Sequence, residues 1–116
     1  MISYSISDIS EEFKLTLRAI RFWEDRGLIN PKRDKRERVY SDGDRSVIAE
    51  IVSRRSQHFT IEEIKQALDA GGFSKQQLLD QSEFLREERA EIDRALTALE
   101  DEIAAGDSQD ERGRNS

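Results

Sequence analysis

The sequence predicts a mostly α-helical protein: a winged helix-turn-helix with a small β-hairpin wing, followed by one long C-terminal helix. Three observations predict this fold. Two short amphipathic segments lie close together early in the chain, with only residues 14–16 between them. A basic segment broken by Pro31 follows and suits a hairpin better than a helix. A seven-residue apolar repeat then runs through the last third of the chain.

Hydroxyl residues mark where the predicted helices begin. Most of them are followed, three residues later, by a side chain that can accept a hydrogen bond from the N–H of the cap. Glycines mark the predicted helix ends, because glycine readily adopts the left-handed C-terminal cap. The predicted helices cover residues 6–13, 17–26, 42–56, 61–70 and 75–104; the predicted N-caps are Ser5, Thr16, Ser41, Thr60 and Ser74, and the predicted C-terminal caps are Gly27, Gly71 and Gly106.

The segment after Gly27 predicts the wing. It is too polar for a helix with a buried face, and Pro31 prevents a helix from continuing through it. A hairpin with its tip near residues 34–36 and a return strand over residues 38–40 fits instead. A basic hairpin that follows a helix-turn-helix is typical of a wing.

The last predicted helix carries a single apolar stripe. One heptad position holds Leu78, Leu85, Ile92 and Leu99, and the other holds Leu96 and Ile103 after the weaker Ser82 and Arg89. A stripe this thin on so long a helix is best covered by a second copy of the helix. The alternative is a helix that folds back on its own domain.

Composition indicates three segments and excludes several classes of site. We expect a DNA-binding domain over residues 1–72, a dimerisation helix over 74–105 and a disordered tail over 106–116, which contains no apolar residue. A tail that binds a partner protein is the alternative to a tail without function. With no cysteine and one histidine among 116 residues, we expect no metal site and no cofactor.

Charge is distributed unevenly along the chain. The net charge is −6, but residues 14–38 contain nine basic and four acidic side chains. A local field of this kind acts on a polyanion within a Debye length of about 8 Å. The alternative is a basic surface that contacts only water. No apolar run approaches the roughly 20 residues that span a bilayer, and the N-terminus carries no export signal, so we expect a soluble cytoplasmic protein.

The second predicted helix has a face suited to a DNA groove. A helical wheel places Arg18 and Phe22 opposite the apolar side, with Ala19 and Arg21 on the flanks. Arginine can bind guanine or phosphate, alanine permits close approach, and an aromatic edge can contact a thymine methyl group. Two alternatives stay open: Phe22 packs against the wing, and Arg21 forms an ion pair with Asp25 on its own helix.

Four segments resemble the MerR family of bacterial transcriptional regulators over residues 4–70. They are Tyr4-Ser5-Ile6, the run from Thr16 to Ile29 (TLRAIRFWEDRGLI), Arg38-Val39-Tyr40, and Phe59-Thr60-Ile61-Glu62-Glu63-Ile64. The resemblance implies a homodimer that binds promoter DNA, with its dimerisation helices in an antiparallel coiled coil. It also implies that bending and untwisting of the promoter spacer align the promoter elements for RNA polymerase.

The resemblance implies a set of DNA contacts. It places Thr16, Arg18, Arg21 and Phe22 against DNA, and Arg38 and Tyr40 against phosphates from the wing. Charge and position along the chain add Lys14, Arg33, Lys35 and Arg36, and the helical wheel adds Ala19.

The sequence departs from the family pattern in its turns and in one aromatic pair. Lys14 and His58 stand where the family usually has glycine. Because positive φ is costly for other residues, we expect these turns to be shaped differently. Phe22-Trp23 replaces the usual tyrosine pair, so two hydroxyl groups are lost.

No catalytic residue is predicted, because the sequence contains no nucleophile–base set, no glycine-rich phosphate loop and no metal cluster. The chain resembles short family members that lack a sensor domain, so no small-molecule effector is identified and repression is at least as expected as activation. Two other classes remain: an architectural or excisionase-like winged-helix DNA-binding protein, and a protein-interaction adaptor whose basic segment is only a surface.

Overall fold

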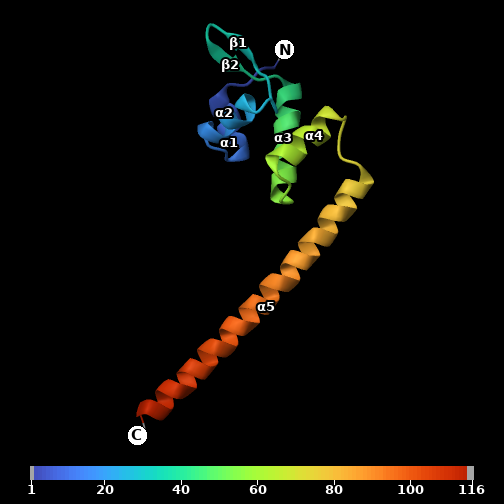
Figure 1. The fold of residues 1–116 in the computed structure, drawn as a ribbon. Helices are drawn as coiled ribbons and strands as arrows, with labels where there is room; N and C mark the ends of the chain where they lie inside the picture. Colours follow the sequence, from blue (N-terminus) through green and yellow to red (C-terminus); the bar gives the residue numbers. More distant parts are fainter. Residues whose placement is uncertain (1, 115–116) are drawn as a thin grey trace. The chain divides into compact units, whose positions relative to one another are not determined.

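A computed structural model describes the backbone of residues 2–114 and the side chains of residues 2–107. The chain divides into two compact units between Phe73 and Ser74. The first unit contains α1 (Ile6–Phe13), α2 (Leu17–Asp25), β1 (Lys32–Asp34), β2 (Glu37–Val39), α3 (Asp42–Ser56) and α4 (Ile61–Asp69), and the second consists of α5 (Lys75–Arg114) (Figure 1). The predicted fold class is confirmed: a helix-turn-helix, a two-stranded hairpin and a long C-terminal helix.

The helices begin at the predicted hydroxyl caps. Ser5 Oγ accepts a hydrogen bond from the Asp8 N–H at 3.1 Å, and the Asp8 carboxylate accepts one from the Ser5 N–H at 2.9 Å. The same reciprocal pair joins Ser41 to Asp44, Thr60 to Glu63, and Ser74 to Gln77 at the start of α5. These bonds satisfy N–H groups that have no partner within a helix, so local sequence specifies each start.

One hydrophobic core holds the first unit together. Its fully buried side chains come from all four helices and from the residue that follows β2: Ile9, Ile20, Ile48, Ile51, Ile64 and Tyr40. Burying a side chain of this size contributes about 1.5–3 kcal/mol. Ile20 and Trp23 are the buried residues of α2, so the opposite face of this helix points outward, as the helical wheel predicts.

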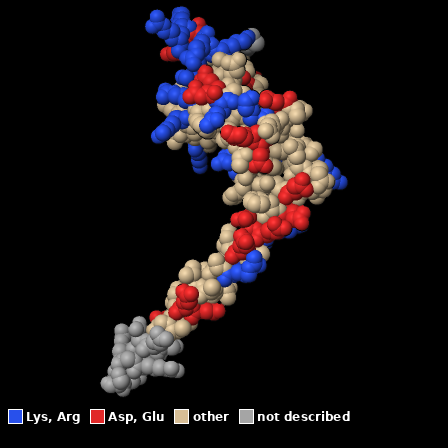
Figure 2. All heavy atoms as spheres, in the orientation of Figure 1, with Lys and Arg blue, Asp and Glu red and all other residues tan. Residues whose placement is uncertain are grey.

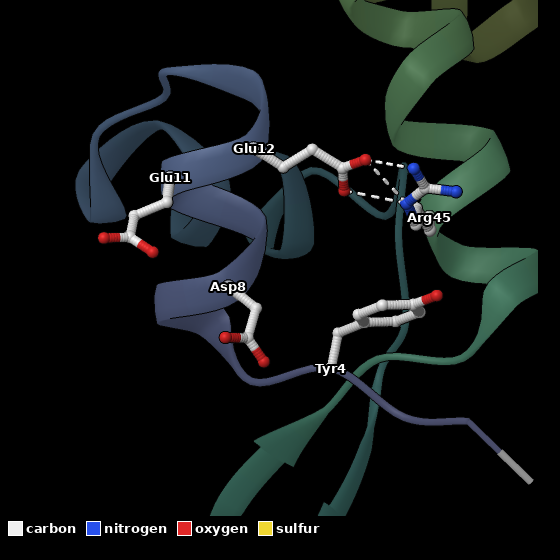
Figure 3. Close-up of a pocket in the computed structure, with 5 residues that line it drawn as sticks. All are labelled: Tyr4, Asp8, Glu11, Glu12 and Arg45. Carbon is white, nitrogen blue, oxygen red and sulfur yellow. Dashed lines mark hydrogen bonds and ion pairs between the residues drawn. The ribbon is translucent and has the colours of Figure 1, made fainter.

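Arg45 of α3 links α1 to α3 at the surface (Figure 3). Its Nε donates to Glu12 Oε2 at 2.7 Å, and its guanidinium lies 5.7 Å from the centre of the Tyr4 ring. The hydrogen bond from Arg45 lowers the pKa of Glu12, and the hydrogen bond that Tyr4 donates to Asp42 raises the pKa of Tyr4. The carboxylates of this face, Asp8 among them, disfavour contact with a polyanion.

Two predicted turns differ from expectation. Lys14 ends α1 with φ 54°, and His58 precedes Phe59 with φ 68°. The expectation of differently shaped turns is therefore wrong: both turns adopt the left-handed conformation without glycine. The cost is about 1–2 kcal/mol for each residue. Gly27, with φ 79°, takes the left-handed conformation predicted for it after α2.

The predicted end of the last helix is also wrong. The sequence placed it near residue 104, with Gly106 as a left-handed cap, whereas the backbone of α5 continues to Arg114. A glycine inside a helix costs only about 1 kcal/mol relative to alanine, so it does not by itself stop a helix. Residues 115–116 of the predicted tail lie outside the described residues. No helix in the described range is both long and apolar enough to cross a membrane.

Candidate nucleic-acid interface

The outward face of α2 presents two arginines. Thr16 begins the helix as predicted, because its Oγ1 accepts a hydrogen bond from the Ala19 N–H at 3.0 Å. Arg18 and Arg21 are exposed, and within the described part of the chain neither forms an ion pair. The alternative pairing of Arg21 with Asp25 does not occur. Both guanidinium groups are therefore available to a ligand outside the chain.

Phe22 lies on the same outward side of α2. Its side chain is 41% exposed, and the Arg26 guanidinium lies 5.1 Å from the ring centre. A cation–π contact at an exposed site contributes about 0.5–1 kcal/mol, so it orders the ring without burying it. Arg26 also reaches Glu62 of α4 at 3.6 Å, but both side chains are more than half exposed and the ion pair stabilises little.

The wing is a short antiparallel hairpin. Lys32, Arg33 and Asp34 of β1 face Val39, Arg38 and Glu37 of β2, in that order. The two residues between the strands, Lys35 and Arg36, have φ 51° and 75°. Positive φ at both positions is what a type I′ turn requires, and such turns usually contain Asn-Gly. Both tip side chains are exposed cations.

Glu24 connects α2 to both strands of the wing. Its Oε1 lies 3.2 Å from Arg33 Nη2, and its Oε2 accepts a hydrogen bond from Arg38 Nε at 2.5 Å. The side chains of Glu24 and Arg38 are only 16% and 21% exposed, whereas that of Arg33 is 51% exposed. The hydrogen bond to Glu24 raises the pKa of Arg38, although burial opposes this. Arg38 is therefore mainly engaged inside the protein, and Arg33 only partly.

The sequence interpretation gave no role to Glu24. A signal was present, because the helical wheel places Glu24 beside the buried Ile20 rather than on the outward face. A carboxylate at the edge of an apolar face, shortly before a basic hairpin, indicates a partner on that hairpin.

The structure brings most of the predicted site residues together. Figure 2 shows Lys and Arg side chains gathered over the wing and around α1 and α2, whereas Asp and Glu are prominent along α5. Glu24 joins the wing to α2, so these two elements form one basic surface. Lys14 is exposed and stands two residues before Thr16, the cap of α2.

Tyr40 does not belong to this surface. Its side chain is fully buried, and its hydroxyl has no hydrogen-bond partner among the described residues. Burial raises the pKa of Tyr40. The predicted phosphate contact is therefore wrong. Side chains two residues apart on a strand point to the same face. Arg38 points toward Glu24 of α2, so Tyr40, which pairs with Tyr4, points to that same side and enters the core.

We expect Tyr40→Phe to leave DNA affinity unchanged. Removing a buried hydroxyl without a partner should also preserve the free energy of unfolding or raise it by up to about 1 kcal/mol. Urea unfolding and a DNA titration of the same preparation measure the two quantities. A loss of DNA affinity with an unchanged free energy of unfolding would show that the Tyr40 hydroxyl does contact DNA.

Comparison with known proteins identifies the family. Residues 4–71 match the family described as MerR HTH family regulatory protein. A comparison of the sequence with curated proteins, by contrast, found no match.

Three solved structures share the fold. A MerR-family transcriptional regulator from Bacillus cereus has 23% sequence identity and a TM-score of 0.76, with 86% of this chain and 79% of that chain covered. MtaN, the N-terminus of the Bacillus subtilis multidrug transporter activator, has 24% identity and a TM-score of 0.75, over 86% of this chain and 97% of that chain. HiNmlR, a MerR-family regulator that lacks the sensor domain and was crystallised on promoter DNA, has 21% identity and a TM-score of 0.65, with 89% of each chain covered.

At these identities the solved structures show a common fold, whereas the family match covers more than half of the chain. The fold, the basic helix-turn-helix surface and this match agree. The chain belongs to the MerR helix-turn-helix family and is a DNA-binding transcription regulator.

Proposed function

We propose that the protein is a sequence-specific dimeric regulator that binds promoter DNA and acts by bending and untwisting it. The observation that carries this proposal is the pair of exposed, unpaired arginines on the outward face of α2, beside a wing with exposed cations. In a family of regulatory proteins, this arrangement fits α2 in the major groove and the wing on the phosphate backbone. HiNmlR, a relative of similar fold, is bound to promoter DNA in its crystals.

The proposed contacts fall into two groups. Arg18 and Arg21, with Ala19 and Phe22 beside them, are assigned to base edges in the major groove. Phosphates are assigned to Thr16 and to the cations around α2 and the wing: Lys14, Arg33, Lys35, Arg36 and, through its remaining donors, Arg38.

Exposed apolar side chains on α5 support a homodimer. None of the side chains described in α5 is buried, and Ile92, Leu96, Leu99 and Ile103 are each more than half exposed. They fall on one heptad stripe, with Leu78 and Leu85 before them. We assign the stripe to an antiparallel coiled coil with a second copy of the chain, since isolated exposure of so many large apolar residues is unfavourable in water.

The proposed mechanism works through the shape of the DNA. Two recognition helices fixed to one dimer demand a set spacing of major grooves, and DNA whose spacing differs must bend or untwist to fit. The deformation would align promoter elements for RNA polymerase, which makes the polymerase a partner on the same DNA. Such a regulator acts in the bacterial cytoplasm, on the chromosome.

A salt titration with chromosomal DNA tests the proposal. We expect the protein to shift specific fragments of its host chromosome, with log affinity falling against log salt by about 0.9 for each neutralised phosphate. Arg36→Gln should flatten that slope by about 0.9 for each copy of the residue in the complex. A slope near zero, or no shifted fragment at low salt, would contradict the proposal.

Footprinting of the shifted fragments distinguishes the remaining alternative. Protection confined to promoter spacers supports a transcription regulator that reshapes its promoter. Protection at recombination sites, or spread along DNA without relation to promoters, would instead favour the architectural or excisionase-like function.

A further inference from the structure

The wing has little that stabilises it from within. Each strand is three residues long, and every side chain of β1 is exposed. The register sets Arg33 opposite Arg38 and Asp34 opposite Glu37, so two neighbouring cross-strand pairs carry like charges. Like charges directly opposite each other destabilise a hairpin. The tip adds two non-glycine residues with positive φ, and an isolated two-stranded hairpin is marginal even without these features.

The Glu24 carboxylate counteracts the repulsion between the two arginines. Each of its oxygens contacts a different guanidinium: Oε1 lies 3.2 Å from Arg33 Nη2, and Oε2 lies 2.5 Å from Arg38 Nε. One carboxylate thus sits between two cations that would otherwise repel each other across the strands. Because Glu24 belongs to α2, the same two contacts also attach both strands to the helix proposed to enter the major groove.

We propose that Glu24 is a positioning residue for DNA binding: its shared carboxylate holds the two opposed arginines of the wing against α2 and so fixes where the wing meets the DNA backbone. This rests on the proposed function. Arg38, largely buried, keeps its bond to Glu24 on DNA. Arg33, half exposed, contacts Glu24 through Nη2 alone and offers its other guanidinium donors to a phosphate.

Substitution of Glu24 gives a test in which the sign of the effect decides. Glu24→Gln removes a negative charge near a polyanion, so simple electrostatics predicts tighter binding. If Glu24 positions the wing, the substitution should instead weaken DNA binding by about tenfold, because the free protein loses its preorganised surface. The probe is a DNA duplex of about 30 base pairs and arbitrary sequence in about 0.1 M KCl, where phosphate contacts dominate affinity.

Asp25→Asn is the matched control. It removes the same charge from the next residue of α2, and Asp25 is exposed and forms no ion pair with any residue whose side chain is described. We expect Asp25→Asn to bind DNA as tightly as the unmodified protein or more tightly. If Glu24→Gln binds as tightly as Asp25→Asn, or if both weaken equally, the proposal is overturned.

A second variant and a direct measurement keep the proposal testable if Glu24→Gln does not fold. Glu24→Asp keeps the charge but shortens the side chain by one methylene, so its carboxylate no longer reaches both arginines. We expect this variant also to weaken DNA binding. Amide hydrogen exchange should accelerate over residues 32–39 in either variant, while exchange in α3 is unchanged. Unchanged exchange in the hairpin would overturn the proposal. If the unmodified protein binds no DNA, the proposed function fails, but hydrogen exchange still tests the role of Glu24.

Discussion

Leu99→Asp is expected to dissociate the proposed dimer into monomers. Leu99 is 55% exposed in the single chain and lies on the heptad stripe of α5. A buried leucine contributes about 1.5–3 kcal/mol, and each dimer contains two copies of the residue, whose replacements would bury unpaired carboxylates. The dimer dissociation constant should therefore rise by at least about a thousandfold, which sedimentation equilibrium measures directly.

Thr97→Asp provides the matched control for this substitution. Thr97 is exposed on α5 and lies away from the stripe, so the same charge placed there should leave the dimer intact. DNA binding should follow the association state, because a monomer carries only one recognition helix. A dimer that survives Leu99→Asp would show that the stripe is covered in another way, such as by the protein's own domain.

Arg18→Ala is expected to weaken binding to the cognate site by about 1–3 kcal/mol and to relax the preference at one base pair. Arg18 is exposed on the outward face of α2 and forms no ion pair within residues 2–107, so its removal leaves no partner unpaired. The cognate site comes from mapping bound fragments of the host chromosome, and titrations with single-base variants of that site give the change in specificity.

Arg36→Ala separates base contacts from phosphate contacts. Arg36 is at the tip of the wing, where a side chain is expected to meet the backbone rather than base edges. Loss of this side chain should weaken binding to all DNA sequences about equally and make the affinity depend less steeply on salt concentration. An equal loss across sequences for Arg18→Ala would reassign Arg18 to a phosphate.

The sequence specified the helical framework because its signals act over short distances. A cap such as Ser5 needs only Asp8, three residues away, and the heptad stripe depends on spacing within one helix. The hairpin was likewise predictable from Pro31 and the polarity around it. Its turn at Lys35-Arg36 replaced the usual glycine-containing pair, so turn chemistry alone would have missed it.

The errors concern contacts between distant parts of the chain. The resemblance places Tyr40 against DNA, whereas the structure buries it. This burial accompanies the bridge to Tyr4, 36 residues earlier, which local pattern does not reveal. The role of Glu24 does not follow from local pattern, because its partners lie on two strands further along the chain. Gly106 suggests a helix end, but glycine only weakens a helix, and the polar residues that follow continue α5.

The hairpin tip carries a conflict between robustness and activity. Lys35 and Arg36 hold a conformation that would suit Asn-Gly better, so replacing them would relieve about 1–2 kcal/mol of strain at each position. The same replacement would remove two cations from the edge proposed to face the phosphates. Laboratory evolution toward heat resistance alone would therefore be expected to reduce DNA affinity at these two positions, whereas a selection that also requires DNA binding would be expected to keep the less stable pair.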